Sequence, residues 1–212
     1  MGFVIAVDGP AASGKGTIAS RLAERFAFGH LDTGLLYRAV GAAVRAAGGD
    51  PDDAAAAEAA ARGIGLQGLE HPSLRGAAAG EAASRVARHP GVRAALYDLQ
   101  RGFTCREPGV VLDGRDIGTV IAPDAQVKLF VTADPQIRAT RRWKQLTGQG
   151  EAIAFERVLE DIRRRDARDA GRDSAPMRAA ADAVLLDTSD LDIEAATDAA
   201  RRIVEAARAE WP

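Results

Sequence analysis

Glycine and lysine residues near the beginning of the sequence have the spacing of a phosphate-binding loop. The run satisfies G-x-x-x-x-G-K and consists of Gly9, Pro10, Ala11, Ala12, Ser13, Gly14, Lys15, Gly16 and Thr17. The backbone N–H groups of such a loop, together with the N-terminus of the helix that follows, converge on one anion. We therefore expect this run to bind the phosphates of a nucleoside triphosphate, with Lys15 reaching the β- and γ-phosphates.

The hydroxyl group of this loop is displaced by one position. Gly16 stands directly after the lysine, where the general motif has serine or threonine as a magnesium ligand, and the hydroxyl follows at Thr17. The form G-K-G-T resembles the loops of nucleoside monophosphate kinases more than those of GTPases. The alternative is a plain glycine turn with a solvated lysine. We disfavour it because an apolar strand precedes the run and a helical pattern follows it.

Charged side chains gather after a second apolar run. Residues 109–113 predict a buried strand that ends at Asp113, whose carboxylate would hold magnesium directly or through water. Arg115 and Asp116 follow, so two carboxylates flank an arginine on the ligand side of the sheet. Strands also end in Asp for reasons of turn geometry, and an Asp-Arg pair can satisfy itself within a turn. Such a turn would not need this many charges, so we favour a functional site.

An arginine-rich helix is predicted near residues 154–170. Continued helical spacing puts Arg165, Arg168, Asp169 and Arg172 on one face, with one carboxylate among three guanidinium groups. A solvated, salt-bridged surface is the commonest fate of such runs and contributes little stability per pair. On the residues alone, that structural interpretation is slightly favoured for this helix.

The preceding helix carries a second group of arginines. Arg138, Arg141 and Arg142 share one face and precede a glycine-bordered segment at 147–151. A mobile segment with arginines at its edges suits a lid that closes over phosphates, excludes water and brings cations to the developing charge. A surface loop without function is the open alternative.

Strands and helices alternate along the whole sequence. Apolar runs predict strands at 3–7, 109–113, 125–131 and 183–186, with a short extended piece at 30–33 that turns at Gly34 into a helix. Helical patterns fill most of the remainder, at 14–26, 34–47, 80–86, 90–103, 134–148, 154–170 and 192–209. The alternation predicts an α/β fold with a parallel sheet, helices on both of its faces, and ligands at the carboxyl ends of the strands.

The segment between the second and third predicted strands has an unusual composition. At 50–53, Asp50 supplies an N-cap, Pro51 the first helical position and the following acids the first turn of an alanine-rich helix. Residues 62–80 are rich in glycine and poor in large apolar groups. We expect little regular structure there and a loosely packed insert on the main domain.

Length and composition exclude several classes of protein. A chain of 212 residues can bury a sizeable core, and its formal net charge of -2 gives no overall attraction to nucleic acid or to acidic membranes. Cys105 is the single cysteine, so neither an internal disulfide nor a zinc cluster is supported. The first apolar run is interrupted at Asp8, and no run approaches the roughly 18 residues of a membrane span. We expect a soluble protein of the reducing cytoplasm.

Four segments become specific when they are taken together in their order along the sequence. They lie at 9–17, 31–38, 112–119 and 165–172, and they closely resemble the bacterial cytidylate kinase family, the (d)CMP kinase branch of the nucleoside monophosphate kinases. The resemblance runs nearly end to end. The segments Asp-Thr-Gly-Leu-Leu-Tyr-Arg and Asp-Gly-Arg-Asp-Ile-Gly-Thr carry more of it than the phosphate loop does.

This resemblance implies a reaction and a fold. The reaction is transfer of the γ-phosphoryl group of ATP to CMP or dCMP, with Mg2+ as cofactor, giving ADP and CDP or dCDP. The fold is a three-layer phosphate-loop kinase fold around a central parallel five-stranded sheet. One kinase domain over 1–212 would carry an insert that binds the nucleoside monophosphate at about 46–104 and a lid at about 142–165. We expect a monomer that binds neither nucleic acid nor membranes.

The resemblance also assigns roles to residues of this sequence. The run at 9–17 would bind ATP, and the catalytic group would be Lys15, Arg115, Arg138 and Arg142. The acceptor would be held by Thr33, Arg38, Ser84, Arg93, Arg115, Asp116, Arg165, Asp169 and Arg172. The metal would be held by Thr17 and Asp113. Within the acceptor site, Arg38 and Arg115 would clamp the phosphate, because the planar fork of arginine binds phosphate by two parallel bonds.

Base and pentose recognition follow in the same way. Cytosine offers an amino donor that Asp116 and the Thr33 oxygen can accept, whereas its acceptor atoms suit Arg93 and Arg172. Uracil has a carbonyl where cytosine has that amino group, so the site should discriminate between them. The pentose would be held by Ser84, Arg165 and Asp169. Residues 63–79 depart from the family, in which many members carry an extra strand-forming stretch.

Two other functions remain open at this point. Another small phosphate-loop kinase, acting on UMP and CMP or on dephospho-coenzyme A, would share the fold but not the segment at 113–116. A nucleotide-binding regulator without enzymatic activity would use the arginine helix to contact nucleic acid. Asp166 and Asp169, interleaved with those arginines, argue against a surface that follows phosphates.

Overall fold

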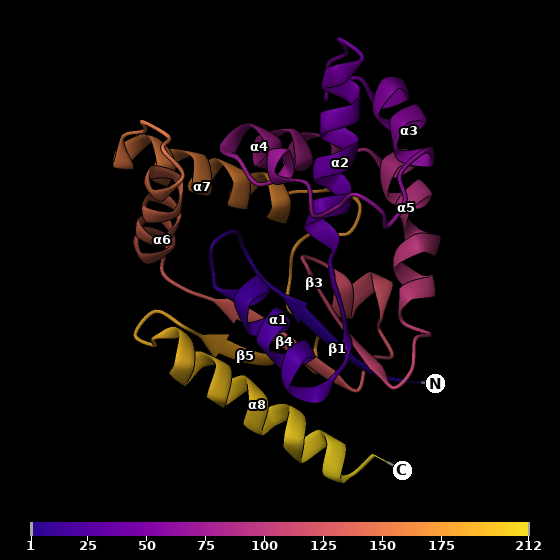
Figure 1. Cartoon of the computed structure of the whole chain (residues 1–212), viewed down its shortest axis with the longest axis vertical. Helices are drawn as coiled ribbons and strands as arrows, with labels where there is room; N and C mark the ends of the chain where they lie inside the picture. Colours follow the sequence, from indigo (N-terminus) through magenta and orange to yellow (C-terminus); the bar gives the residue numbers. More distant parts are fainter. Residues whose placement is uncertain (1, 212) are drawn as a thin grey trace.

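The central sheet contains five parallel strands in the order β2-β3-β1-β4-β5 (Figure 1). It belongs to a computed structural model that describes residues 2–211. The strands are β1 Phe3–Asp8, β2 Gly29–Asp32, β3 Gly109–Gly114, β4 Val127–Thr132 and β5 Val184–Asp187. The predicted five-stranded α/β sheet is therefore confirmed, and β1, which precedes the glycine-rich run, lies at its centre.

Strand β1 is buried on both faces and divides the core into two apolar clusters. Because successive side chains of a strand point to opposite faces, Ile5 and Val7 join one cluster while Val4 and Ala6 join the other. The continuous apolar run of β1 is the pattern expected for a strand covered by helices on both sides. The carboxyl end of β1 is thereby fixed in the middle of the molecule.

Two helices cover one face of the sheet. They are α1 Lys15–Phe26 and α8 Ile193–Ala209, and they share one apolar cluster. Figure 1 shows α1 in front of the strands and α8 below them. In α8, Ala196, Ala200 and Val204 recur every four residues and pack into the same cluster as Ile5. The Asp192 carboxylate caps α8 by accepting the Ala195 N–H at 2.8 Å.

The opposite face carries the helices of the predicted acceptor insert. They are α2 Thr33–Ala46, α3 Ala54–Arg62, α4 Ala77–Val86 and α5 Pro90–Phe103. The contact of α2 with α4 is close at Gly41, where an added Cβ would lie 2.7 Å from the Ala82 Cβ. The helices pack on the sheet through a shared apolar cluster that includes Leu36, Val40 and Leu96.

The start of α3 differs from the prediction. Asp53, not Asp50, is the N-cap, and its carboxylate accepts the N–H groups of Ala55 at 2.9 Å and Ala56 at 3.1 Å. Pro51 therefore lies before the helix. The Asp50 carboxylate is engaged elsewhere, because it accepts the Asp52 N–H at 3.0 Å and pairs with Arg85.

The segment at 62–80 is more ordered than we predicted. It contains a 3-10 turn, η1 Pro72–Leu74, and α4 begins at Ala77, earlier than residue 80. Leu69 and Leu74 are buried, with Leu69 in the cluster that covers the sheet. The prediction of a loose insert was wrong on this point because a few large side chains are enough to attach a glycine-rich segment to a core.

The remaining helices form a hairpin at the carboxyl end of the sheet. It consists of α6 Pro135–Gly148 and α7 Phe155–Ala170 (Figure 1). The hairpin has a small apolar cluster of its own, made of Ala139, Leu146, Val158 and Ile162. This separate cluster is compatible with movement of the hairpin as a unit, while the proposed bounds of insert and lid stay predictions.

A short π-helical turn, η2 Ile117–Ile121, follows β3 and was not predicted. Such turns are rare and occur frequently at functional sites. None of the helices within residues 2–211 has the length and apolar character required to span a membrane.

Candidate active site

The phosphate-binding run turns sharply between β1 and α1. Gly14 has φ 92 and is the N-cap of α1, so the helix begins at Lys15, one residue after the predicted start. Gly9 has φ 149, and an added Cβ would lie 2.0 Å from the Val131 carbonyl oxygen of β4. Glycine is required at position 9 by this close approach and at position 14 by the left-handed backbone.

Replacing Gly9 by alanine is expected to lower the free energy of unfolding by more than about 2 kcal/mol, because backbone of β1 or β4 would have to move. Gly65→Ala is the matched control, since an added Cβ there meets no atom within 4 Å. The control should change stability by less than about 0.5 kcal/mol. Denaturant unfolding measures both variants, and a Gly9→Ala protein as stable as the control would contradict the predicted clash.

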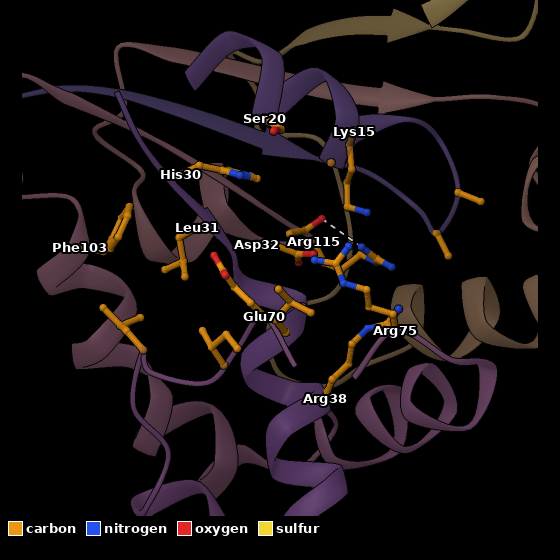
Figure 2. Close-up of a pocket in the computed structure, with 18 of the residues that line it drawn as sticks. Lys15, Ser20, His30, Leu31, Asp32, Arg38, Glu70, Arg75, Phe103 and Arg115 are labelled. Atoms are coloured by element: carbon orange, nitrogen blue, oxygen red, sulfur yellow. Dashed lines mark hydrogen bonds between the residues drawn. The ribbon is translucent and has the colours of Figure 1, made fainter. Parts of the chain in front are cut away.

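A cleft of about 720 Å3 opens at the carboxyl ends of the strands. Figure 2 shows Lys15, Arg38 and Arg115 pointing into it from α1, α2 and the segment after β3. Arg142 of α6 and Arg165 of α7 line the same cleft. Five of the predicted cationic residues therefore converge on one space, although they come from separate parts of the sequence.

The cations of this cleft disfavour their own charged forms. Burial and the charge of Arg115 lower the pKa of Lys15 to about 7, although the charges of Asp113 and Asp32 oppose the change. Burial and the neighbouring Arg115 likewise lower the pKa of Arg165 to about 9. A polyanion such as a triphosphate would relieve this repulsion, so the cleft is suited to bind one.

A second cavity of about 450 Å3 lies behind the phosphate-binding run. Its lining includes Thr17, Arg141 and Arg142 together with residues that follow β5. Arg141 donates to the Thr188 carbonyl oxygen at 2.6 Å and to the Thr188 hydroxyl at 2.9 Å, which fixes α6 to the end of β5. The cavity adjoins the run at Gly14, so a nucleoside attached to bound phosphates can reach it.

A third, much smaller cavity of about 40 Å3 has room for roughly one water molecule. It lies among most of the residues predicted to bind the acceptor, which are Thr33, Ser84, Arg93, Arg115, Asp116, Arg165, Asp169 and Arg172. The predicted constellation is thus brought together around one space. That space must widen before it admits a pyrimidine.

A buried ion pair closes one end of the small cavity. Arg93 donates to the Asp116 carboxylate, and both side chains are less than a tenth exposed. Burial raises the pKa of Asp116, although Arg93 and Arg172 oppose this rise. The Thr33 hydroxyl donates to the Asp113 carbonyl at 2.8 Å, so its oxygen can still accept a hydrogen bond. A ligand with an amino group can compete with Arg93 for the Asp116 oxygens.

Asp169 lies at the centre of the other end of the small cavity. It accepts hydrogen bonds from the Ser84 hydroxyl at 3.2 Å, from Arg115 Nε at 3.0 Å and from Arg172. Arg165 Nε lies 3.7 Å from the same carboxylate. Burial works to raise the pKa of Asp169, but these arginines outweigh it and hold the pKa below its usual value.

One member of the predicted arginine face lies elsewhere. Arg168 pairs with Glu81 of α4 at 2.9 Å and does not contact Asp169. The third guanidinium group around Asp169 belongs instead to Arg115, which arrives from β3. Helical spacing identified the right carboxylate but could not show which arginine a neighbouring helix would attract.

Arg138 is buried and points toward the phosphate-binding run. Its guanidinium group donates to the carbonyl oxygens of Ala133 at 2.8 Å and Ala11 at 3.2 Å. It also forms a two-pronged pair with Asp166 of α7, with distances of 3.2 and 2.6 Å. Its catalytic role stays a prediction. In this arrangement Arg138 ties the α6–α7 hairpin to the loop through Ala11.

The residues predicted to hold magnesium lie on two sides of the loop. Asp113 is buried and its carboxylate interacts with His30 Nε2 at 2.9 Å, whereas Thr17 is exposed and lines the second cavity. A Cβ at Gly16 would lie 3.6 Å from Asp113 Oδ2, so this carboxylate faces the loop itself. Within residues 2–211 no group of three or more His, Cys, Asp or Glu is arranged to hold a metal. A single carboxylate that faces the phosphate-binding run is the kind of ligand that Mg2+ takes together with phosphates and water.

Two residues of the site escaped prediction. Asp32 pairs in register with Asp113 on the adjacent strand and lines the large cleft, where Figure 2 shows it near Lys15 and Arg115. Burial and the charge of Asp113 raise the pKa of Asp32. Tyr37 lines the small cavity, and the Arg93 guanidinium lies 5.8 Å from its ring centre. Both belong to the segment at 31–38 that carried the resemblance.

Comparison of the sequence with known proteins identifies a family with which this chain shares nearly its whole length. A family model described as "Cytidylate kinase" matches residues 5–207. A cytidylate kinase of Caulobacter sp. (strain K31) is 67% identical over 211 residues, which cover 100% of this chain and 98% of that protein. A cytidylate kinase of Xanthobacter autotrophicus (strain ATCC BAA-1158 / Py2) is 61% identical over 98% of this chain and 99% of its own.

The comparison with solved structures concerns the fold. The chain is similar to an uncharacterized protein from Eubacterium ventriosum, with a TM-score of 0.55 and 14% sequence identity. That similarity covers 96% of this chain and 98% of the other. At this identity the likeness describes the arrangement of helices and strands alone.

Proposed function

Since the chain belongs to the cytidylate kinase family, we propose that it transfers the γ-phosphoryl group of ATP to CMP or dCMP, giving ADP and CDP or dCDP. The observation that carries the proposal is the convergence of Lys15, Arg38, Arg115, Arg142 and Arg165 on one cleft beside the buried Asp116. Phosphoryl transfer needs positioning and charge neutralisation rather than a covalent nucleophile on the protein, and this cleft supplies both.

The donor site is formed by the phosphate-binding run and the second cavity. Backbone N–H groups at 9–17 and the N-terminus of α1 bind the triphosphate of ATP, and Lys15 reaches its outer phosphates. The nucleoside occupies the space beside Arg141 and Thr188. Asp113 and Thr17 would hold Mg2+, directly or through water, and the ion would supply positive charge against the phosphates during transfer.

The acceptor phosphate is clamped by Arg38 and Arg115. Both line the large cleft opposite Lys15, and the Arg38 guanidinium also donates to the Leu74 carbonyl of the insert at 2.7 Å. Arg38 thereby connects the acceptor phosphate to the backbone of the insert. Two guanidinium forks on one phosphate hold its oxygen in line with the γ-phosphorus of the donor.

Cytosine is recognised in the small cavity. The Asp116 carboxylate and the Thr33 oxygen accept from the cytosine amino group, while Arg93 and Arg172 donate to its ring acceptors. Because Arg93 already pairs with Asp116, binding rearranges an existing hydrogen bond instead of desolvating a free charge. Uracil would place a carbonyl oxygen against the carboxylate, which is unfavourable.

The pentose lies between the base and the phosphate. Ser84, Asp169 and Arg165 line the small cavity and already form a connected network, and Arg165 also lines the large cleft. A pentose hydroxyl can accept from Arg165 and donate to Asp169. The lowered pKa of Asp169 keeps this carboxylate ionised and able to accept.

Closure of the α6–α7 hairpin completes the site. Arg142 lines both the large cleft and the donor cavity, so it lies where charge develops during transfer. Arg138 acts from beneath the phosphate-binding run through Ala11. We propose that 142–165 moves as the lid and that 46–104 moves as the acceptor insert, which widens the small cavity.

A nucleotide-binding regulator is less well supported. Arg165 and Arg172 face the acceptor cavity and Arg168 is paired with Glu81, so these arginines do not form an exposed stripe for nucleic acid. We expect a cytoplasmic monomer, and the free thiol of Cys105 fits a reducing compartment.

A coupled assay across the nucleoside monophosphates tests the proposed function. With ATP and Mg2+, the purified protein should phosphorylate CMP and dCMP at least about 10²-fold more efficiently than UMP, because the base pocket rejects a misplaced acceptor. AMP and GMP should be poorer still. Chelation of Mg2+ should abolish turnover. Equal use of UMP would overturn the assignment of the base pocket, and activity with dephospho-coenzyme A alone would overturn the acceptor class.

A further inference from the structure

Asp8 is a buried acid that does not line any of the three cavities described above. It is the last residue of β1, is 4% exposed, and directly precedes the phosphate-binding run. Its carboxylate accepts two backbone hydrogen bonds from the turn that follows β3, from the Ile117 N–H at 2.8 Å and the Gly118 N–H at 2.8 Å. The two oxygens are therefore each committed to one amide.

These amides are the first two of the π-helical turn η2. The initial N–H groups of a helical turn have no partner within the turn and need an acceptor from outside. Asp116 occupies the N-cap position, where an Asp side chain would ordinarily accept them, yet it makes no such hydrogen bond. Asp8 supplies the cap from another strand and leaves the Asp116 carboxylate free to turn toward Arg93 and the small cavity.

Among residues 2–211, no cationic side chain forms an ion pair or a hydrogen bond with the Asp8 carboxylate. Its hydrogen bonds are to amides alone, and the charges that act on it are those of Asp116 and Arg115. Lys128 of β4 packs its methylene groups against Gly118, but its ammonium group binds Asp182 at 2.6 Å and the Pro123 carbonyl. A buried carboxylate without a charged partner is expensive to keep, which indicates that the two amides need an anionic acceptor.

We propose that Asp8 is a positioning residue for base recognition, because it fixes the backbone that aims Asp116 at the cytosine amino group. This inference rests on the proposed function. It also connects the two substrates, since the residue that orients the acceptor pocket is joined directly to the donor loop at Gly9.

Asp8→Asn is the decisive variant, because it keeps the shape of the side chain while replacing one acceptor by an NH2 group that opposes an amide. We expect kcat/KM for CMP to fall about 10-fold or more, mainly through KM, and the preference for CMP over UMP to fall about 10-fold. KM for ATP should stay within about twofold. Asp182→Asn is the matched control, since it removes the partner of Lys128 beside the same turn, and it should leave all of these constants unchanged.

The pH profile separates positioning from general loss of structure. Burial is the main cause that raises the pKa of Asp8 to about 7, and the charge of Asp116 adds to it. The two amide hydrogen bonds and the charge of Arg115 act in the opposite direction. Protonation removes an acceptor, so kcat/KM for CMP should fall as pH drops through about 7, with an inflection that Asp8→Asn lacks. In the wild-type protein, the amide proton shifts of Ile117 and Gly118 should titrate with this same midpoint. This second measurement does not depend on the folding of a variant.

The outcomes distinguish this inference from the proposed function. An Asp8→Asn enzyme with unchanged KM for CMP and unchanged CMP preference would overturn the role of Asp8, as would equal losses with every acceptor. Amide shifts that are insensitive to pH over the whole range in which carboxyl groups titrate would also overturn the capping. A wild-type protein without CMP kinase activity whose Ile117 and Gly118 amides still titrate together would overturn the function but not the capping of η2.

Discussion

Lys15→Ala is expected to lower kcat about 10³-fold with every acceptor nucleotide, while KM for CMP changes little. The ammonium group lies in the large cleft where the donor phosphates bind, and it has no role in the small cavity that reads the base. Burial, together with the charge of Arg115, lowers the pKa of Lys15 to about 7, so a bound polyanion would favour its charged form. Steady-state coupled assays with CMP and dCMP measure the loss in kcat.

Lys144→Ala is the matched control for this experiment. Lys144 lies on α6 and is exposed, so it should retain wild-type turnover. A Lys15→Ala enzyme that retains more than about a tenth of wild-type kcat would contradict the role of the ammonium group in transfer. A large rise in KM for CMP with unchanged kcat would instead place Lys15 in acceptor binding.

Asp116→Ala is expected to reduce the preference for CMP over UMP by about 10²-fold or more, through loss of CMP activity rather than gain of UMP activity. Asp116 and Asp169 are the two acidic residues among the described residues that line the small cavity. Asp116 is the one that pairs with Arg93. Removing it deletes the acceptor of the cytosine amino group. Competition between CMP and UMP in one reaction gives the ratio directly.

The same substitution has a structural consequence that must be measured alongside. Arg93 would remain buried without its partner, which is expected to cost about 3 kcal/mol or more in the free energy of unfolding. Asp124→Ala is the control, because it removes a partner of Arg101 at the exposed surface and should change stability by less than about 1 kcal/mol. A folded Asp116→Ala protein that keeps its preference would refute the assignment of Asp116 to base recognition.

Local sequence patterns were sufficient for the elements that position the donor site. The apolar run of β1, the glycines at 9 and 14 and the helical spacing after Lys15 act over neighbouring residues, so the strand, the turn and α1 could all be predicted. The same holds for the acid that ends β3, because strand length and burial fix where Asp113 stands. Boundaries shifted by one residue at the start of α2 and by three at the start of α4.

Pairings between distant elements could not be predicted in this way. The partner of Arg168 is Glu81 rather than Asp169, and the partner of Arg138 is Asp166, because helices that pack together bring their own charges. The cap that Asp8 provides for η2 joins residues more than a hundred positions apart. Sequence spacing describes one helix or strand at a time, so such contacts become visible only when the sheet order is known.

The separate apolar cluster of the α6–α7 hairpin affects how readily the site can open. Outside the hairpin, this cluster touches two small side chains, Ala12 of the phosphate-binding run and Ala77 of α4. If the hairpin swings outward, it exposes little apolar surface and leaves both large clusters intact, so we expect motion in the microsecond-to-millisecond range without unfolding. The rate of product release would then depend on the two alanine contacts and on the polar contacts that tie the hairpin to the rest of the chain, which are made by Arg138, Arg141, Arg168 and Asp169.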